Sequence, residues 1–170
     1  KNALEQNTKV KGIILTSPTY YGIVNPDLPR IVALAHEHRV PVLIDEAHGA
    51  HFIASDAFPQ TSLQSGADIV VQSAHKTLPA MTMASYLHIN SELVDYERVE
   101  HYLQMLQSSS PSYLLMASLD DARAYVESYL EPDAKYCIEK RNQWIEAITT
   151  IPDVEVLKVD DPLKLLIRVN

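Results

Sequence analysis

Short apolar runs that alternate with helix-like segments constrain the fold of this chain more than any other feature. Three such runs are present, at residues 12–17, 42–45 and 68–73. Runs of this length that end in turn-forming residues are typical of strands buried on both faces of a parallel sheet. Between the first two, Asp27 is expected to cap a helix that carries Pro29 in its first turn and ends before Pro41.

The rest of the first half fits the same architecture. Residues 62–64 are expected to form a short helix that Gly66 closes, and the more mixed run at 84–89 is expected to pair antiparallel at the end of the sheet. Strands joined by helical crossovers predict an α/β fold with a mainly parallel sheet and helices on both faces. Such sheets bind their ligands at the carboxyl ends of the strands.

The second half is helical in pattern. Helices are expected to start at Ser91, at Ser110-Pro111 and at Asp133. Two short runs, 154–157 and 163–169, close the chain and are expected to begin a further subdomain. We therefore expect residues 1–131 to belong to a large domain, and residues 132–170 to form a connecting helix and the start of a C-terminal subdomain.

Composition limits the class of protein. The chain has 170 residues, 46% hydrophobic and 21% charged, which suits one globular domain. No apolar run approaches the roughly 18 residues of a membrane helix, and no signal-peptide core follows the N-terminus, so we expect a cytoplasmic protein. The formal charge of −8 argues against nucleic acid as a partner. The lone Cys137 is expected to be a small buried filler of a helix face.

Two charged side chains follow neighbouring predicted strands. Asp45 ends the second apolar run, and Lys76 comes shortly after the third. Each has an ordinary structural explanation, since Asp45 can cap the following turn and Lys76 can be a solvated amine. They can also form a salt bridge with each other, or hold opposite ends of one flat ligand. Pyridoxal phosphate requires the last arrangement, because its aldehyde reacts with an amine and its pyridine nitrogen is kept protonated by an anion.

The motifs around these two residues resemble those of a known family. They read Thr-Ser-Pro-Thr-Tyr-Tyr-Gly at 16–22, Asp-Glu-Ala-His-Gly-Ala-His at 45–51 and Ser-Ala-His-Lys-Thr-Leu-Pro-Ala at 73–80, and the likeness continues into 107–113. In this order they resemble the bacterial Orn/Lys/Arg decarboxylases, which are fold-type-I, aspartate-aminotransferase-like enzymes that use pyridoxal 5'-phosphate. The resemblance implies the PLP-dependent transferase-like large domain, present here in part.

The resemblance also implies roles for individual residues. Lys76 would be the lysine that forms the Schiff base, and Asp45 the partner of the pyridine nitrogen. His48 would lie on the substrate side of the cofactor.

Other positions would bind the cofactor itself. Ala47 would pack its methyl group against one ring face, and Ser73 and His75 would lie around the phosphate. The serine run at 108–110 resembles a segment that reaches the cofactor phosphate of a neighbouring subunit, which implies a homodimer or higher homo-oligomer.

The implied reaction is decarboxylation of lysine, ornithine or arginine to an amine and CO2, a step of polyamine metabolism. The family's phosphate-binding loop and ring-stacking His are missing from this sequence, which starts without Met and ends within a strand-like run. We therefore expect an excised piece that is inactive alone and binds the cofactor weakly at best.

Other interpretations remain open at this point. Residues 44–48 also match the acidic box of helicases, although the glycines of a phosphate-binding loop are absent. Asp45, His48 and His51 offer metal-ligating groups, but histidines of a polar loop more often make structural hydrogen bonds. An aminotransferase of the same fold and a non-catalytic assembly module are the remaining alternatives. His36 and His38 are expected to be solvated.

Overall fold

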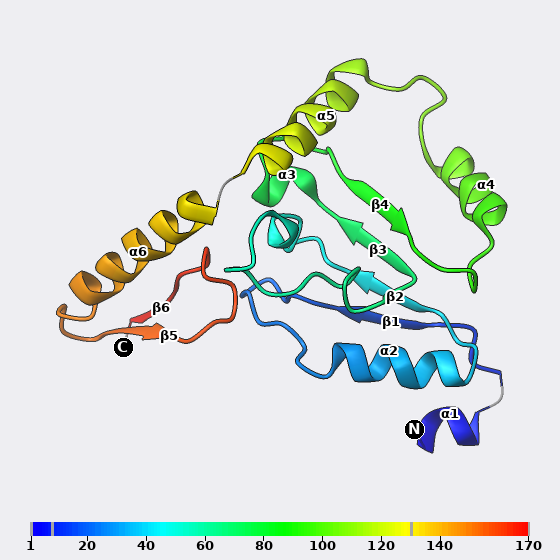
Figure 1. Ribbon diagram of the computed structural model, residues 1–170, viewed down its shortest axis with the longest axis horizontal. Coiled ribbons are helices and arrows are strands. Elements are labelled where there is room, and N and C mark those ends of the chain that lie inside the picture. The colour runs from blue at the N-terminus through cyan, green and yellow to red at the C-terminus, as the bar shows by residue number, and fades with distance from the viewer. Residues whose placement is uncertain (1, 8, 130, 170) are drawn as a thin grey trace.

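The computed structural model describes residues 2–7, 9–129 and 131–169 (Figure 1). The elements follow the order α1 (Asn2–Gln6), β1 (Ile13–Thr16), α2 (Leu28–Glu37), β2 (Val42–Asp45), η1 (Phe52–Ala54), β3 (Ile69–Gln72), α3 (Ala74–Thr77), β4 (Tyr86–Ile89), α4 (Tyr96–Leu106), α5 (Tyr113–Ser128), α6 (Glu131–Ile148), β5 (Val154–Leu157) and β6 (Leu166–Val169). None of the helices in these described ranges is long and apolar enough to cross a membrane.

Four strands form the main sheet in the order β1-β2-β3-β4. The first three run parallel, with Thr16 opposite Asp45 and Asp45 opposite Val71, so their carboxyl ends meet at one edge. Strand β4 pairs antiparallel with β3, as the sequence predicted. The expected fold class, a mainly parallel α/β sheet flanked by helices, is confirmed.

The core lies between α2 and one face of the sheet. In the sequence, Leu28, Ile31, Val32 and Ala35 are spaced to form one apolar stripe of a helix. In α2 this stripe packs on strands β2 and β3, with Leu28, Val32 and Ala35 buried. The buried members of this cluster are Leu28, Val32, Ala35, Val40, Val42, Ile44, Ala67 and Val70. Burying one large aliphatic side chain contributes roughly 1.5–3 kcal/mol, so this cluster holds the strands in register.

The opposite face of the sheet is less covered. Strand β1 was expected to be buried on both faces, and this was wrong, because Ile14 is 76% exposed. The reason is that β1 is an edge strand and α2 covers only the other face. Val71 of β3 and Leu87 of β4 are exposed as well.

Several predicted helix starts shifted. Residues 62–64 form turns rather than the expected helix. Gly66 closes these turns, with a φ of +85°. Helix α4 begins after Asp95, whose side chain accepts a hydrogen bond from Arg98 N, whereas Ser91 accepts one from Leu93 N in a local turn. The short polar side chains thus stabilise a turn at one position and a helix start at the other.

The last two long helices also differ from expectation. Helix α5 is capped by Ser112, whose hydroxyl accepts from Leu115 N, and α6 includes Glu131 instead of starting at Asp133. Cys137, predicted as a buried filler, is exposed. In α6 the buried position is Ala134, so the helix turns a different side than Cys137 toward the rest of the protein.

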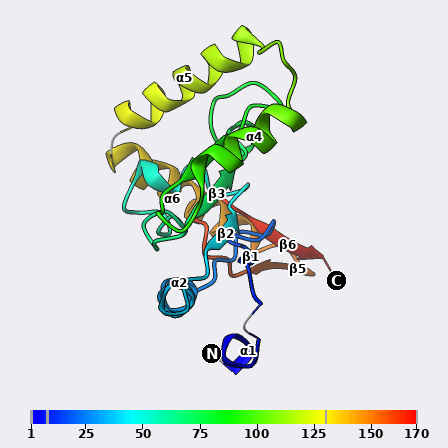
Figure 2. The ribbon, with the colours of Figure 1, turned by 90° about the vertical axis from the view of Figure 1, so that its right-hand side faces the viewer.

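The C-terminal hairpin of β5 and β6 lies on the side of the molecule where β1, β2 and β3 end (Figure 1). Helices α4 and α5 lie on the side of the sheet where β4 is the outer strand, whereas α1 and α2 lie on the side of β1 (Figure 2). The hairpin is therefore the part of the second half that approaches the edge where the sequence predicted chemistry.

Candidate active site

The sheet register brings the two predicted polar positions to adjacent strand ends. Asp45 is the last residue of β2, and Lys76 lies in the single turn of α3 that follows β3 after Ser73. Because β2 and β3 run parallel, both side chains belong to the carboxyl edge of the sheet.

The amine of Lys76 is held by a histidine. Lys76 Nζ lies 3.3 Å from His48 Nε2, and the His48 ring meets the ring of Tyr20 edge to face at 5.2 Å between centroids. Burial lowers the pKa of His48, and the nearby ammonium groups of Lys76 and Lys164 lower it further. A neutral imidazole can therefore accept a hydrogen bond from the Lys76 ammonium at Nε2. The other ring nitrogen, Nδ1, is buried and has no hydrogen-bond partner in the described part of the protein.

A pocket of about 460 Å³ surrounds this pair. Its lining comes from the loop after β1, the loop after β2, helix α3 and the segment before β6: Tyr20, Tyr21, His48, Lys76, Lys164, Leu165 and Leu166. Residues distant in sequence thus build one cavity at the strand ends, with the C-terminal segment as one wall.

Asp45 is exposed and caps a turn. Its Oδ1 accepts a hydrogen bond of 3.0 Å from Ala47 N, which is one of the structural roles expected for it. Within the described residues Asp45 forms no ion pair with Lys76. The carboxylate and the amine therefore stand at neighbouring strand ends without neutralising each other, as a flat ligand held from two ends requires.

Two of the other predicted cofactor residues, Ser73 and His75, lie close to Lys76 in sequence, whereas Ala47 belongs to the loop after β2. Ser73 is half-buried at the start of α3, and its side chain makes no capping hydrogen bond there. His75 Nδ1 lies 2.8 Å from the carbonyl oxygen of Ala84, which orients the ring. By contrast, the serines at 108–110 lie in an exposed loop between α4 and α5, outside the lining of the pocket.

A buried polar network lies directly behind the site. Glu46 Oε1 accepts from the backbone N–H of Ser62 at 2.7 Å and from its hydroxyl at 2.8 Å, and Oε2 accepts from Gln72 Nε2 at 2.7 Å. Burial raises the pKa of Glu46, although these hydrogen bonds act in the opposite direction. Gln72 Oε1 continues the network to His88 Nε2 at 3.0 Å. This network ties the end of β2 to the end of β3.

Sequence reasoning missed this role of Glu46, since it considered the residue only as part of an acidic box. The available signal was a carboxylate directly after a buried strand, which is desolvated unless polar partners surround it.

The three suggested metal ligands do not converge. His51 Nε2 lies 3.1 Å from Asp161 Oδ1, with both side chains buried, whereas His48 contacts Lys76 and Asp45 caps its own turn. Among the described residues, no three His, Cys, Asp or Glu side chains are grouped to hold a metal ion.

His36 was expected to be solvated, and this was only partly right. Its Nε2 lies 2.9 Å from Asp68 Oδ2, and its side chain is 38% exposed. The buried Asp68 carboxylate needs a partner at this end of the sheet, and His36 supplies one.

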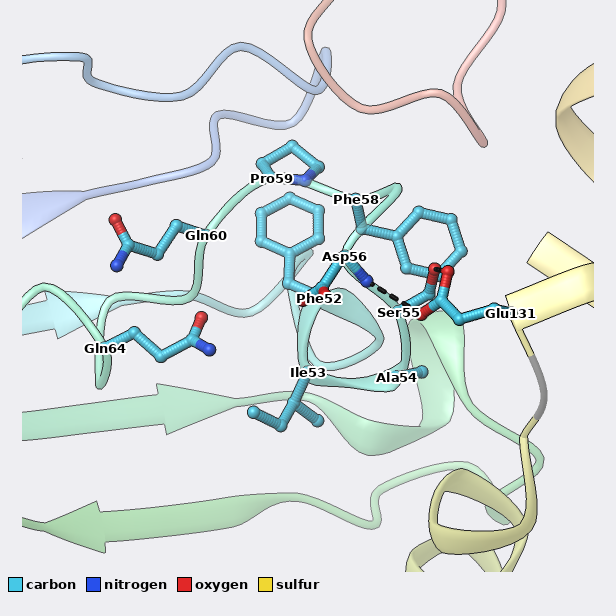
Figure 3. Close-up of a pocket in the computed structure, with 10 residues that line it drawn as sticks. All are labelled: Phe52, Ile53, Ala54, Ser55, Asp56, Phe58, Pro59, Gln60, Gln64 and Glu131. Carbon is cyan, nitrogen blue, oxygen red and sulfur yellow. Dashed lines mark hydrogen bonds between the residues drawn. The ribbon is translucent and has the colours of Figure 1, made fainter. Parts of the chain in front are cut away.

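A second pocket, of about 340 Å³, lies beside η1 (Figure 3). Glu131 accepts hydrogen bonds there from the Ser55 hydroxyl at 2.9 Å and from Asp56 N at 3.0 Å. These contacts fasten α6 to the loop after η1. Asp45 lines neither pocket, but only the other pocket contains Lys76 and His48, so that pocket is the better candidate for an active site.

The fold of this chain is shared with solved structures of other proteins. The structure resembles the cysteine desulfurase CsdA of Escherichia coli, with a TM-score of 0.72 and 19% identity over 99% of this chain and 46% of that chain. It also resembles the lysine decarboxylase LdcF of Francisella novicida, with a TM-score of 0.64 and 20% identity over 87% of this chain and 22% of that chain. These likenesses confirm the predicted fold, a mainly parallel α/β sheet flanked by helices.

The family follows from sequence comparison. Residues 1–167 match the model of the Orn/Lys/Arg decarboxylase major domain, so the chain belongs to this family of decarboxylase-type enzymes. It is 53% identical to the uncharacterized protein YaaO of Bacillus subtilis (strain 168), covering 99% of this chain and 36% of that protein. It is 37% identical to an arginine decarboxylase of Bacillus anthracis, covering 100% of this chain and 36% of that protein. The chain thus spans about a third of the length of these relatives.

Proposed function

We propose that this chain is part of a pyridoxal-phosphate-dependent decarboxylase of basic amino acids. The observation that carries the proposal is the placement of Lys76, in contact with His48, and Asp45 at the ends of adjacent parallel strands. Membership of the Orn/Lys/Arg decarboxylase family supports the reaction class.

The residues present fit the cofactor. An amine and an unneutralised carboxylate lie at one edge of the sheet, and buried polar atoms beside Lys76, His48 Nδ1 and Thr77 Oγ1, have no partner in the protein. Bound there, pyridoxal phosphate would supply an electron sink for the pair left behind when CO2 departs. Asp45 would hold a proton on the pyridine nitrogen, and Lys76 would supply the amine that bonds to the aldehyde.

The neighbouring residues would support these two. His48, kept neutral by burial, would accept a hydrogen bond from Lys76 at Nε2 and so orient the amine toward the aldehyde. Ala47 would pack on the ring, and Ser73 and His75 would donate to the phosphate.

The substrate we propose is arginine, lysine or ornithine, with arginine first because relatives 36–38% identical carry the name arginine decarboxylase. We further propose that residues 1–131 belong to the cofactor-binding large domain and 132–170 to the connection and start of a C-terminal subdomain. The complete protein would act as a cytoplasmic homo-oligomer in polyamine metabolism, and residues 108–110 would approach a neighbouring subunit.

The test is product analysis with a matched pair of variants of the complete protein. We expect an amine and CO2 from a basic amino acid, whereas a keto acid would indicate an aminotransferase. Asp45→Asn should lower kcat by at least about a hundredfold, because the pyridine nitrogen loses its anion. Asp27→Asn, at an exposed helix start where the side chain makes no capping bond, should leave kcat unchanged. Near-normal turnover of Asp45→Asn contradicts the assigned role.

A further inference from the structure

A second lysine lines the pocket of Lys76. Lys164 is half-buried, and its Nζ lies 6.0 Å from the centroid of the Tyr20 ring. The positive charge of Lys164 contributes to the lowered pKa of His48, after burial and the charge of Lys76. Within the described residues Lys164 makes no ion pair, and no carboxylate is among the side chains that line the pocket. The lining of the pocket therefore carries two cations, while the carboxylates of Asp45 and Asp161 lie outside the lining and act on the pKa of His48 in the opposite direction.

The backbone that carries Lys164 is fastened on several sides. The N–H groups of Asp160 and Asp161 both donate to the carbonyl oxygen of Gly22, at 3.0 and 2.9 Å, and Lys164 N donates to Asp161 O at 3.1 Å. Arg141 Nη2 donates to Lys164 O at 3.4 Å. These bonds join the C-terminal segment to the loop after β1 and to α6.

The buried pair of His51 and Asp161 adds a further attachment. Asp161 Oδ1 also accepts from Leu163 N at 2.9 Å, so the same carboxylate anchors the segment to the loop after β2 and shapes its turn. The position of Lys164 is consequently set by the two loops that build the site.

The stem of Lys164 packs against a glycine. Gly22 has a φ of +82°, and a Cβ there would lie 2.7 Å from Lys164 Cγ and 3.1 Å from Lys164 Cβ. No side chain at position 22 can be accommodated without displacing Lys164, so the aliphatic stem has a defined path toward the pocket.

We propose that Lys164 binds the carboxylate of the amino-acid substrate. This inference rests on the proposed function, which assigns Lys76 to the cofactor and leaves Lys164 as the unpaired cation of the pocket. A lysine held in place by its backbone makes a charge-assisted hydrogen bond to a carboxylate at little cost in side-chain ordering. It also repels the distal cation of a basic amino acid, so the substrate enters in one orientation.

The experiment compares two ligands that differ only in the carboxylate, arginine and its decarboxylated amine. Binding is measured by calorimetry to the complete, cofactor-loaded protein in a Lys76→Ala background, which prevents turnover and leaves Lys164 as the lysine of this pocket. Lys164→Gln should weaken binding of arginine by roughly ten- to a hundredfold and leave binding of the amine unchanged. Gly22→Ala, which displaces the Lys164 stem, should show the same selectivity.

Lys158→Gln is the matched control, because Lys158 is exposed in the same C-terminal segment and does not line the pocket. An equal loss for both ligands, or no loss for arginine, refutes the role of Lys164 and leaves the proposed function standing. If the parent background binds neither arginine, lysine nor ornithine, the proposed function and the role of Lys164 are both refuted.

Discussion

Replacing Glu46 with Ala tests the framework that holds the two strand ends together. The substitution leaves three buried donors without an acceptor, namely the Ser62 N–H, the Ser62 hydroxyl and the Gln72 amide. Each unsatisfied buried group costs about 1–3 kcal/mol, so the three together should lower the free energy of unfolding by roughly 3–9 kcal/mol. At about 2–4 °C per kcal/mol for a chain of this size, the Tm should fall by at least roughly 6 °C.

The variant Glu46→Gln keeps a side-chain oxygen that accepts hydrogen bonds but cannot ionise, so it tests the ionisation of Glu46 separately from its hydrogen bonds. Burial raises the pKa of Glu46 above its ordinary value of 4.5, so the native state binds more protons than the unfolded state at pH values just above 4.5. The stabilisation from protonated Glu46 is therefore fully present below pH 4.5 and is lost as the pH rises through the raised pKa. Glu46→Gln cannot ionise and should lack this part of the pH dependence.

The assay is chemical and thermal unfolding of wild type and variants, followed by circular dichroism between pH 4 and pH 8. Glu139→Gln, on the exposed side of α6, is the control and should unfold like wild type. The reasoning is refuted if Glu46→Ala unfolds within about 1 kcal/mol of wild type, or if Glu46→Gln keeps the wild-type slope of stability against pH.

Three further predictions follow from contacts around the site. Gly49→Ala would place a Cβ 2.7 Å from Glu46 Cγ and 2.9 Å from Pro18 Cδ, and should lower the free energy of unfolding by about 1–3 kcal/mol in denaturant titrations. His51→Ala leaves the buried Asp161 without its partner and should cost about 1–3 kcal/mol, and the double variant His51→Ala/Asp161→Ala should lose less than the sum of the single losses. Lys76→Met removes a positive charge that lowers the pKa of His48, so that pKa, followed by NMR titration, should rise; an unchanged or lower value would contradict the contact.

The sequence predicted those features that local patterns encode. Apolar runs located the strands, the stripe of α2 located the core, and the strand ends located Asp45 and Lys76. Helix starts were less accurate, because Ser91 and Asp95 are both good capping residues and only the packed chain decides between a turn and a helix. The exposed Cys137 shows a related limit, since an apolar position on a helix says nothing about what covers it.

What local patterns could not predict are contacts between distant residues. His51 and Asp161 lie 110 positions apart, and neither residue alone indicates that they pair in the interior. Lys164 is one of two lysines after α6, the other being Lys158, and only the folded chain brings Lys164 to the pocket of Lys76. The site is thus assembled by the docking of a segment whose sequence carries no sign of the chemistry.

The most direct test of this account is reduction of the complete, cofactor-loaded protein with borohydride, followed by peptide mapping. The account predicts that pyridoxyl label is found on the peptide containing Lys76 and is lost in Lys76→Arg. Stable labelling of another lysine, with Lys76 unmodified, would contradict the central claim.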